Sequence, residues 1–265
     1  RVRVLGWGRH IPPQPVVDLE KDDMARLMVG RDIKQMFPER DDVQASDIAL
    51  SVRNVSVDGQ VRDASFDLRR GEVLGFAGIV GAGRTALMQA IIGLRERSSG
   101  EIARNGDTVR IHNLQDAKKC GIAYLTKDRK GSGLLLNMDM RPNLTLLALE
   151  KFGRVIIDRK AEEAALASAI EAFDIRAADP KTKVGDFSGG NQQKLLLAKV
   201  METDPEIVII DEPTRGIDIG TKSQIYHFIG DLTKQGKSVI LLSSEMPEML
   251  GLSDRIAVMA AGVIT

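Results

Sequence analysis

The sequence has little of several features, and each shortage excludes a class of protein. Cys120 is the one cysteine, so an internal disulfide framework is excluded and a reducing cytosol is the expected compartment. Lysine plus arginine and aspartate plus glutamate number 37 each, so no net field attracts the chain to nucleic acid or anionic lipid. No apolar run approaches the ~18–20 residues that span a bilayer. The 265 residues suffice for one large core, or a core with a small satellite.

What the sequence does contain is a glycine-rich loop, residues 78–85, between an apolar run at 73–77 and a helical pattern at 86–92. Its spacing is that of a phosphate-binding loop with arginine in place of the usual lysine. Glycines let backbone N–H groups converge on phosphate oxygens, and the threonine hydroxyl could hold Mg²⁺. The alternative is a strand-to-helix turn that binds nothing. The candidate nucleotide-binding residues here are Gly78, Gly81, Ala82, Gly83, Arg84 and Thr85.

Two further motifs follow the loop in a fixed order. Residues 187–194, Phe-Ser-Gly-Gly-Asn-Gln-Gln-Lys, open a helix. Residues 206–211 form an apolar strand that ends in Asp211, and Glu212 follows directly. A carboxylate at the end of a strand can bind Mg²⁺, and Asp211 would do so through water. Glu212 could polarise the attacking water. The alternative for two acids after a strand is a helix N-cap. The candidate metal ligands are therefore Thr85 and Asp211, and the candidate catalytic residue is Glu212.

Together these motifs, about 110 and 20 residues apart, resemble the nucleotide-binding domain of ABC transporters. The closer resemblance is to the second, C-terminal cassette of tandem-cassette bacterial sugar importers of the ribose/galactose/xylose type. The motifs that carry it are Val80 to Thr85, Asp128 to Leu134, Ser188 to Lys194 and Asp211 to Asp218, and the resemblance covers roughly residues 20–265. The resemblance implies ATP and Mg²⁺ as cofactors.

The expected fold is α/β: a doubly wound sheet of the P-loop NTPase type with an antiparallel β subdomain and an inserted helical subdomain. Alternating apolar residues at 48–55 and 61–68 around Asp58-Gly59 predict a hairpin. Weak strand signals and an Ala/Glu-rich stretch predict the helical subdomain at about 140–185. We expect the ATPase domain to span 46–265 and to be truncated at its C-terminus. Residues 1–45 are interpreted as the tail of a preceding cassette plus a linker, the alternative being an ordinary N-terminal extension.

The sequence departs from the family pattern at several functional positions. Arg84 replaces the loop lysine, Lys127 takes the place of a glutamine that touches Mg²⁺, and Ser244 takes that of a histidine that holds the γ-phosphate. The first hairpin offers Val57 and Val61 where an aromatic side chain usually stacks on adenine. We therefore expect the domain's own ATP site to be degenerate, with weak or absent hydrolysis at its own loop.

The resemblance also implies partners. ABC cassettes work as head-to-tail pairs, so the signature residues would complete the site of the partner cassette, in the same or a related chain. Transmembrane permease subunits and, indirectly, a periplasmic or extracellular sugar-binding protein complete the expected assembly, at the cytoplasmic face of the bacterial inner membrane. No nucleic acid is expected. The signature residues concerned are Ser188, Gly189, Gly190 and Gln192.

The leading hypothesis is thus an ABC transport ATPase domain that energises import of a monosaccharide. Two alternatives stay open: a soluble, non-transport ABC protein associated with ribosomes or DNA repair, and a purely regulatory nucleotide-binding module. The neutral charge and the lack of basic clusters weigh against the first alternative.

Overall fold

The structure, a computed structural model, describes residues 5–6, 9–10, 36–39, 47–153, 155–177 and 179–265. Two sheets organise it: a six-stranded sheet of order β12-β11-β5-β10-β9-β8 and a four-stranded sheet of order β4-β3-β6-β7. A separate pair, β1 (Leu5–Gly6) and β2 (Arg9–His10), is antiparallel. Most of the predicted segment 1–45 lies outside the described residues.

The larger sheet is parallel apart from one edge strand, and its centre is buried on both faces. Three of its strands are buried at every position: β5 (Val73–Ala77), β9 (Ile207–Asp211) and β10 (Ser238–Leu242). Continuous apolar runs suit such strands, because helices or a second sheet must cover each face. The remaining strands are β8 (Ile122–Leu125), β11 (Arg255–Ala260) and β12 (Val263–Ile264), the last antiparallel to β11.

Successive residues of these strands contribute to two different cores, because side chains alternate across a strand. Ile209 and Ile240 pack in the core shared with the antiparallel sheet, whereas Ile210 and Leu241 pack in the core shared with the helices. Each fully buried side chain of this kind stabilises the fold by about 1.5–3 kcal/mol. The sheet is therefore the layer that holds both halves of the domain together.

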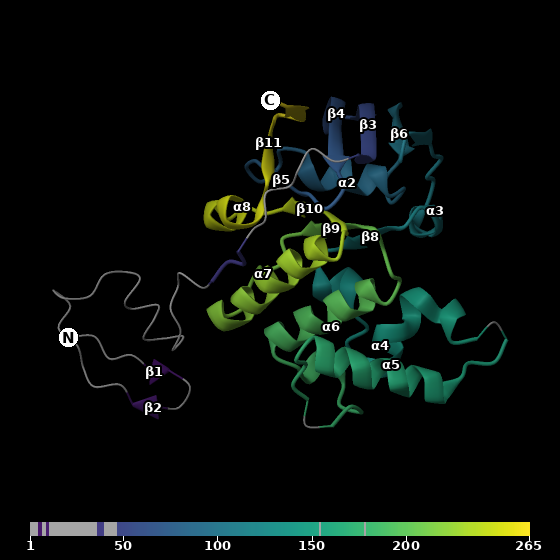
Figure 1. The fold of residues 1–265 in the computed structure, drawn as a ribbon, viewed down its shortest axis with the longest axis vertical. Coiled ribbons are helices and arrows are strands. Elements are labelled where there is room, and N and C mark those ends of the chain that lie inside the picture. Colours follow the sequence, from purple (N-terminus) through teal and green to yellow (C-terminus); the bar gives the residue numbers. More distant parts are fainter. Residues whose placement is uncertain (1–4, 7–8, 11–35, 40–46, 154, 178) are drawn as a thin grey trace.

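The antiparallel sheet covers the first core. The turn Asp58-Gly59 joins β3 (Ile48–Val57) to β4 (Val61–Arg69), as the alternation predicted, with Gly59 at φ 69°. Helix α2 (Arg84–Ile91) lies between the two sheets (Figure 1), and six of its eight residues are buried. The other elements on this side are β6 (Ser99–Arg104), β7 (Asp107–Thr108) and α3 (Leu114–Lys119).

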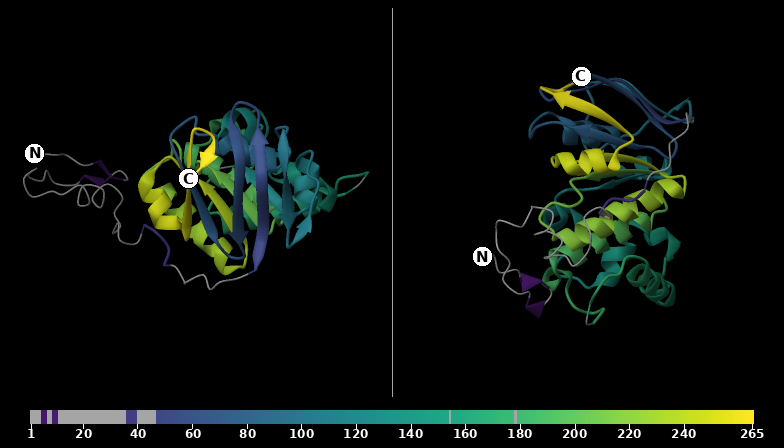
Figure 2. Two further views of the ribbon diagram at one scale, coloured as in Figure 1. Left: turned by 90° about the horizontal axis from the view of Figure 1, so that it is seen from above. Right: turned by 60° about the vertical axis from the view of Figure 1, so that its left-hand side comes forward.

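Helices cover the opposite face of the large sheet (Figures 1 and 2). Gly75 lets α8 approach β5 closely, since a Cβ there would lie 2.2 Å from Ser253 Oγ and 2.3 Å from Met249 Cε. None of the helices in the described ranges combines the length and hydropathy needed to cross a bilayer. The helices on this side are α6 (Gly189–Met201), α7 (Ile219–Lys234) and α8 (Met246–Leu252).

The predicted helical segment follows β8 and leads into α6. A π-helical turn, η3, spans Arg129–Gly133, and the stretch from 140 to 186 contains short helices and one long one. The long helix begins at an Asp158 N-cap that accepts from two backbone N–H groups. These elements are α4 (Met140–Thr145), η4 (Leu146–Lys151), α5 (Arg159–Ala172) and η5 (Val184–Asp186).

One short N-terminal segment, Met36–Glu39, packs on the domain through Phe37 and Pro38. The ring of Phe37 stacks on that of Tyr226 in α7, with centroids 4.9 Å apart and planes 10° apart. A Cβ on Gly251 of α8 would lie 2.2 Å from the Phe37 ring, so glycine leaves the space that the ring fills.

Candidate functional site

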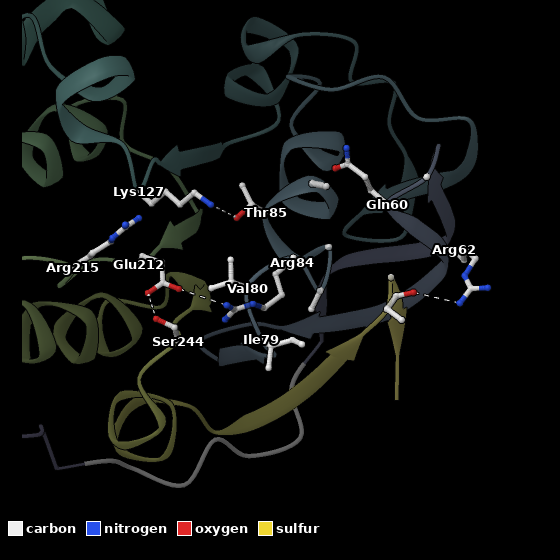
Figure 3. A pocket seen from close by; sticks show the side chains of 17 residues that line it. Gln60, Arg62, Ile79, Val80, Arg84, Thr85, Lys127, Glu212, Arg215 and Ser244 are labelled. Carbon is white, nitrogen blue, oxygen red and sulfur yellow. Dashed lines mark hydrogen bonds and ion pairs between the residues drawn. The ribbon is translucent and has the colours of Figure 1, made fainter.

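The candidate site is a cavity of about 870 Å³ at the carboxyl edge of the parallel strands. Because β8, β9, β10 and β5 run in one direction, the segments that follow them meet at this edge. The loop after β5 supplies the glycines, and the ends of β9 and β10 supply Glu212 and Ser244 (Figure 3). The lining residues are Gly59, Gln60, Arg62, Ile79, Val80, Gly81, Ala82, Gly83, Arg84, Thr85, Ala86, Lys127, Glu212, Arg215, Ser244, Ala261 and Gly262.

The glycine-rich loop has the backbone geometry of an anion site. Gly81 and Gly83 have φ values of 90° and 100°, which side chains rarely adopt. A Cβ on Gly83 would also lie 2.6 Å from the carbonyl oxygen of Gln60. Gly83 is the N-cap of α2, and no side chain in the described part of the chain caps that helix. Its first N–H groups are thus available to phosphate oxygens.

Arg84 is turned away from the mouth of this loop. Its side chain is buried, and Nη1 donates to the carbonyl oxygens of Phe76 at 3.1 Å and Ser243 at 2.5 Å. Nη2 lies 3.6 Å from Glu212 Oε1 (Figure 3). The guanidinium therefore joins the ends of β5, β9 and β10. A planar fork with three partners inside the protein cannot serve a phosphate as a lysine ammonium would.

The two predicted magnesium ligands do meet. Thr85 Oγ1 donates to Asp211 Oδ2 at 3.0 Å, and Tyr124 Oη donates to the same oxygen at 2.9 Å. Burial raises the pKa of Asp211, and the hydrogen bonds from Tyr124 and Thr85 oppose that rise. Burial, followed by the charge of Asp211, raises the pKa of Tyr124, so the phenol stays protonated and remains a donor.

Lys127 stands where the magnesium ion was expected. Its Nζ donates to Thr85 Oγ1 at 3.1 Å (Figure 3), across 42 residues of sequence. An ammonium group there repels a divalent cation and occupies a lone pair that the cation needs. The residues as arranged therefore do not fit Mg²⁺ unless Lys127 moves. The magnesium role of Thr85 and Asp211 stays a prediction.

Glu212 is held in a constrained position. Its backbone φ of 51° is left-handed, uncommon for glutamate, and its N–H donates to the carbonyl of Leu242 at 2.8 Å. Its carboxylate accepts from Ser244 Oγ at 3.0 Å and faces Arg84. The carboxylate predicted to polarise the attacking water is thus engaged by donors from its own chain.

A buried carboxylate supports this edge from behind. Glu248 of α8 is 1% exposed, and it accepts from the hydroxyls of Thr214 and Ser243. Thr214 belongs to the turn after β9, and Ser243 follows β10, so Glu248 connects both segments that carry Glu212 and Ser244. The sequence suggested no role for Glu248, because a lone glutamate in an amphipathic helix resembles any solvated one.

The predicted signature residues lie at the start of α6 and are not among the residues that line the cavity. Ser188 is exposed and caps α6 by accepting from the N–H of Asn191 at 3.3 Å. Gly189 is half-buried and Gly190 buried. Gln192 is 3% exposed and donates to the carbonyl of Val184 at 3.1 Å, so its amide braces the helix start from inside.

The cavity also contains residues that the sequence did not single out. Gln60, in the turn before β4, and Arg62, in β4, extend the cavity, and Arg62 donates to the carbonyl of Ala261 at 3.3 Å. Val57 and Val61, the hairpin positions where an aromatic ring was missing, are 4% and 2% exposed and face the core. In a strand whose alternate residues are buried, the positions between them face outward. Arg62 occupies such a position next to Val61, and this pattern could have identified it.

Comparison with known proteins gives the family. The model of the ABC transporter family matches residues 61–215. The chain belongs to the ABC transporter family. It is 43% identical over 267 residues to a ribose import ATP-binding protein of Clostridium perfringens, covering 100% of this chain and 53% of that protein. A ribose import ATP-binding protein of Agrobacterium fabrum is 38% identical over 269 residues, again with 53% of its length covered.

Solved structures agree on the fold. A nucleotide-free ATP-binding cassette from an ABC transporter superimposes with a TM-score of 0.71 at 19% identity, over 82% of this chain and 89% of that one. A dimeric bacterial ABC transporter cassette gives 0.70 at 18% identity, over 81% and 96%. The predicted fold class and the resemblance to sugar-import ATP-binding proteins are confirmed. The chain spans about half the length of the relatives it matches.

Proposed function

We propose that this chain is the ATP-binding domain of an ABC importer for a monosaccharide and takes part in ATP-driven transport. One observation carries the proposal: the glycine loop at the start of α2 and the acids Asp211 and Glu212 at the end of β9 meet at one edge of the sheet. The relatives named as ribose import ATP-binding proteins support transport over the ribosomal, DNA-repair and regulatory alternatives.

ATP would lie along the cavity with its phosphates on the loop. The N–H groups at the start of α2 would bind phosphate oxygens, with the positive end of the helix behind them. The base would lie toward Gln60 and Arg62, where an arginine face replaces an aromatic ring.

Hydrolysis at this loop would be weak. Glu212 has to orient a water, yet its carboxylate is held by Arg84 and Ser244. Position 244 has a serine in place of the histidine that would hold the γ-phosphate. Its short hydroxyl donates to Glu212 and does not extend to the centre of the cavity. Removing one donor that acts in the transition state costs about 10²–10³ in rate. The domain would bind ATP here more effectively than it turns ATP over.

The signature segment would act in the partner's site instead. Ser188 presents a hydroxyl at the start of α6, where free N–H groups favour an anion. Because the segment does not line this cavity, the phosphate it meets would belong to the first cassette of the same or a related chain. Permease subunits and, indirectly, a sugar-binding protein would complete the assembly at the cytoplasmic face of the inner membrane. No nucleic acid is involved.

The test is steady-state ATPase of the reconstituted full-length importer. Ser188→Arg should lower the rate about 100-fold or more, through a steric clash and lost donors in the competent site. Arg84→Lys combined with Ser244→His should change it by less than about threefold, because this domain's loop does not limit the cycle.

Two control variants separate site chemistry from helix capping. Ser188→Asn keeps a capping oxygen and should retain folding, and Asn113→Arg removes the comparable cap of α3 away from the cavity. The importer carrying Asn113→Arg should keep its rate. An intact rate in Ser188→Arg together with a lost rate in Arg84→Ala would reverse the proposed asymmetry.

A further inference from the structure

The hydroxyl of Thr85 is shared between an anion and a cation of the chain itself. Its one proton goes to Asp211 Oδ2, 3.0 Å away, so the oxygen lone pairs face Lys127, whose Nζ donates at 3.1 Å. A magnesium ion would need the same oxygen at about 2.0–2.1 Å. The side chain of Lys127 thus places one positive charge at the position of a divalent ion.

The other charged groups at this position are already balanced. Asp211 accepts hydrogen bonds from the neutral hydroxyls of Thr85 and Tyr124, and its charge is offset by that of Lys127. Glu212 faces Arg84 and accepts from Ser244. Adding a doubly charged ion beside Lys127 brings like charges together without a carboxylate left over to offset them.

Lys127 is also placed to reach a phosphate. It follows β8 at the same sheet edge as the glycine loop and lines the cavity from the side opposite Gln60 and Arg62 (Figure 3). Its flexible stem and three rotatable donors let the ammonium keep Thr85 and still contact phosphate oxygens. Arg84, which holds the usual lysine's place in the loop, points instead to carbonyl groups.

We propose that Lys127 supplies the positive charge that a divalent cation would otherwise supply, so that this cavity binds a nucleoside triphosphate without requiring magnesium. The inference rests on the proposed function, since it presumes that nucleotide binds here. It gives the opposite expectation from the sequence, which predicted a magnesium-dependent site at Thr85 and Asp211.

Calorimetric titration of the chain with ATP tests this, once with excess EDTA and once with excess MgCl₂. The wild-type dissociation constants in the two conditions should agree within about threefold. Lys127→Gln, which removes the charge but keeps a polar side chain, should weaken binding in EDTA by about tenfold or more, and magnesium should restore it. The matched control is Lys130→Gln, an exposed lysine that does not line the cavity, and it should behave as wild type.

Manganese provides a second readout that does not depend on affinity. With ATP and Mn²⁺, the electron paramagnetic resonance spectrum of the wild-type chain should show only manganese coordinated by ATP. Lys127→Gln should show an additional signal from manganese coordinated by protein side chains.

The outcomes separate the two proposals. Wild-type binding that needs magnesium, with a loss of about tenfold or more in EDTA, overturns this inference and leaves nucleotide binding intact. No binding in either condition overturns the inference together with the proposed function. Should Lys127→Gln fail to fold, the wild-type comparison and the manganese spectrum decide alone.

Discussion

At the scale of single residues, the site is defined by where side chains point rather than by which motif they belong to. Arg84 belongs to the phosphate-loop motif but donates to backbone carbonyls, whereas Lys127 belongs to no phosphate motif and reaches the loop threonine. Arg62 is similar, since it lines the cavity from an exposed strand position. The cavity therefore still contains positively charged side chains, but Lys127 and Arg62 supply them from positions outside the phosphate-loop motif.

Arg62 gives the prediction at this scale. If its guanidinium stacks on the base, Arg62→Ala should weaken ATP binding by roughly two- to fivefold, equivalent to the ~0.5–1 kcal/mol of an exposed cation–π contact. Binding of inorganic tripolyphosphate should not change, because that ligand has no base. Calorimetry with both ligands measures the difference.

The matched control is Arg110→Ala, an exposed arginine that does not line the cavity. It should leave both affinities as they are. Equal losses for ATP and tripolyphosphate in Arg62→Ala would mean that Arg62 contacts phosphate and not the base.

At the scale of elements, the functional edge depends on helix α8 as well as on the strands. Glu248 accepts from Thr214 and Ser243, and these three side chains are each at most 2% exposed. Burial leaves each polar group dependent on its partners. The turn after β9 and the end of β10 are thereby fixed to one carboxylate.

Removing that carboxylate should destabilise the domain. Glu248→Ala leaves two buried hydroxyls without an acceptor and a gap in the core, at a cost of about 2–4 kcal/mol in the free energy of unfolding. Chemical denaturation measures it, with Glu171→Ala on the exposed face of α5 as the control of near-zero effect. Glu248→Gln, which keeps an acceptor, should lose less, and an equal loss would show that packing volume alone matters.

At the scale of the whole molecule, one N-terminal segment is part of the packed domain. Phe37 stacks on Tyr226 and fills the space above Gly251, joining Met36–Glu39 to α7 and α8. Pro38 similarly lies where a Cβ on Gly230 would come within 2.7 Å. Gly230 of α7 and Gly251 of α8 therefore leave the space into which this segment packs, and we call this space the seat.

A double-mutant cycle tests the seat. In the wild type, Gly251→Ala should destabilise, because its Cβ would collide with the Phe37 ring. In a Phe37→Ala background the same change should stabilise by up to about 1 kcal/mol, since alanine favours a helix and the ring is gone. Denaturant midpoints of the four proteins give the coupling. Gly251→Ala with the same effect in both backgrounds would mean that Phe37 does not occupy the seat in solution.

The sequence by itself determined most of the elements and their order. The apolar runs at 73–77 and 206–211, the alternation around Asp58-Gly59 and the glycine spacing at 78–85 each depend on neighbours in the chain, so local pattern was sufficient to predict them. The family resemblance and the fold class followed and are confirmed. The two-residue strand β12 was missed because so short a segment carries no periodicity.

Only the tertiary structure decided how the site residues pair. Lys127 reaches Thr85, Tyr124 reaches Asp211 and Arg84 reaches Ser243 across 42, 87 and 159 residues of sequence. These pairs exist because the register of β8, β9, β10 and β5 brings the ends of four strands to one edge of a sheet. The spacing of residues along the chain does not contain that register. The site residues could therefore be identified from the sequence, whereas their interaction partners could not.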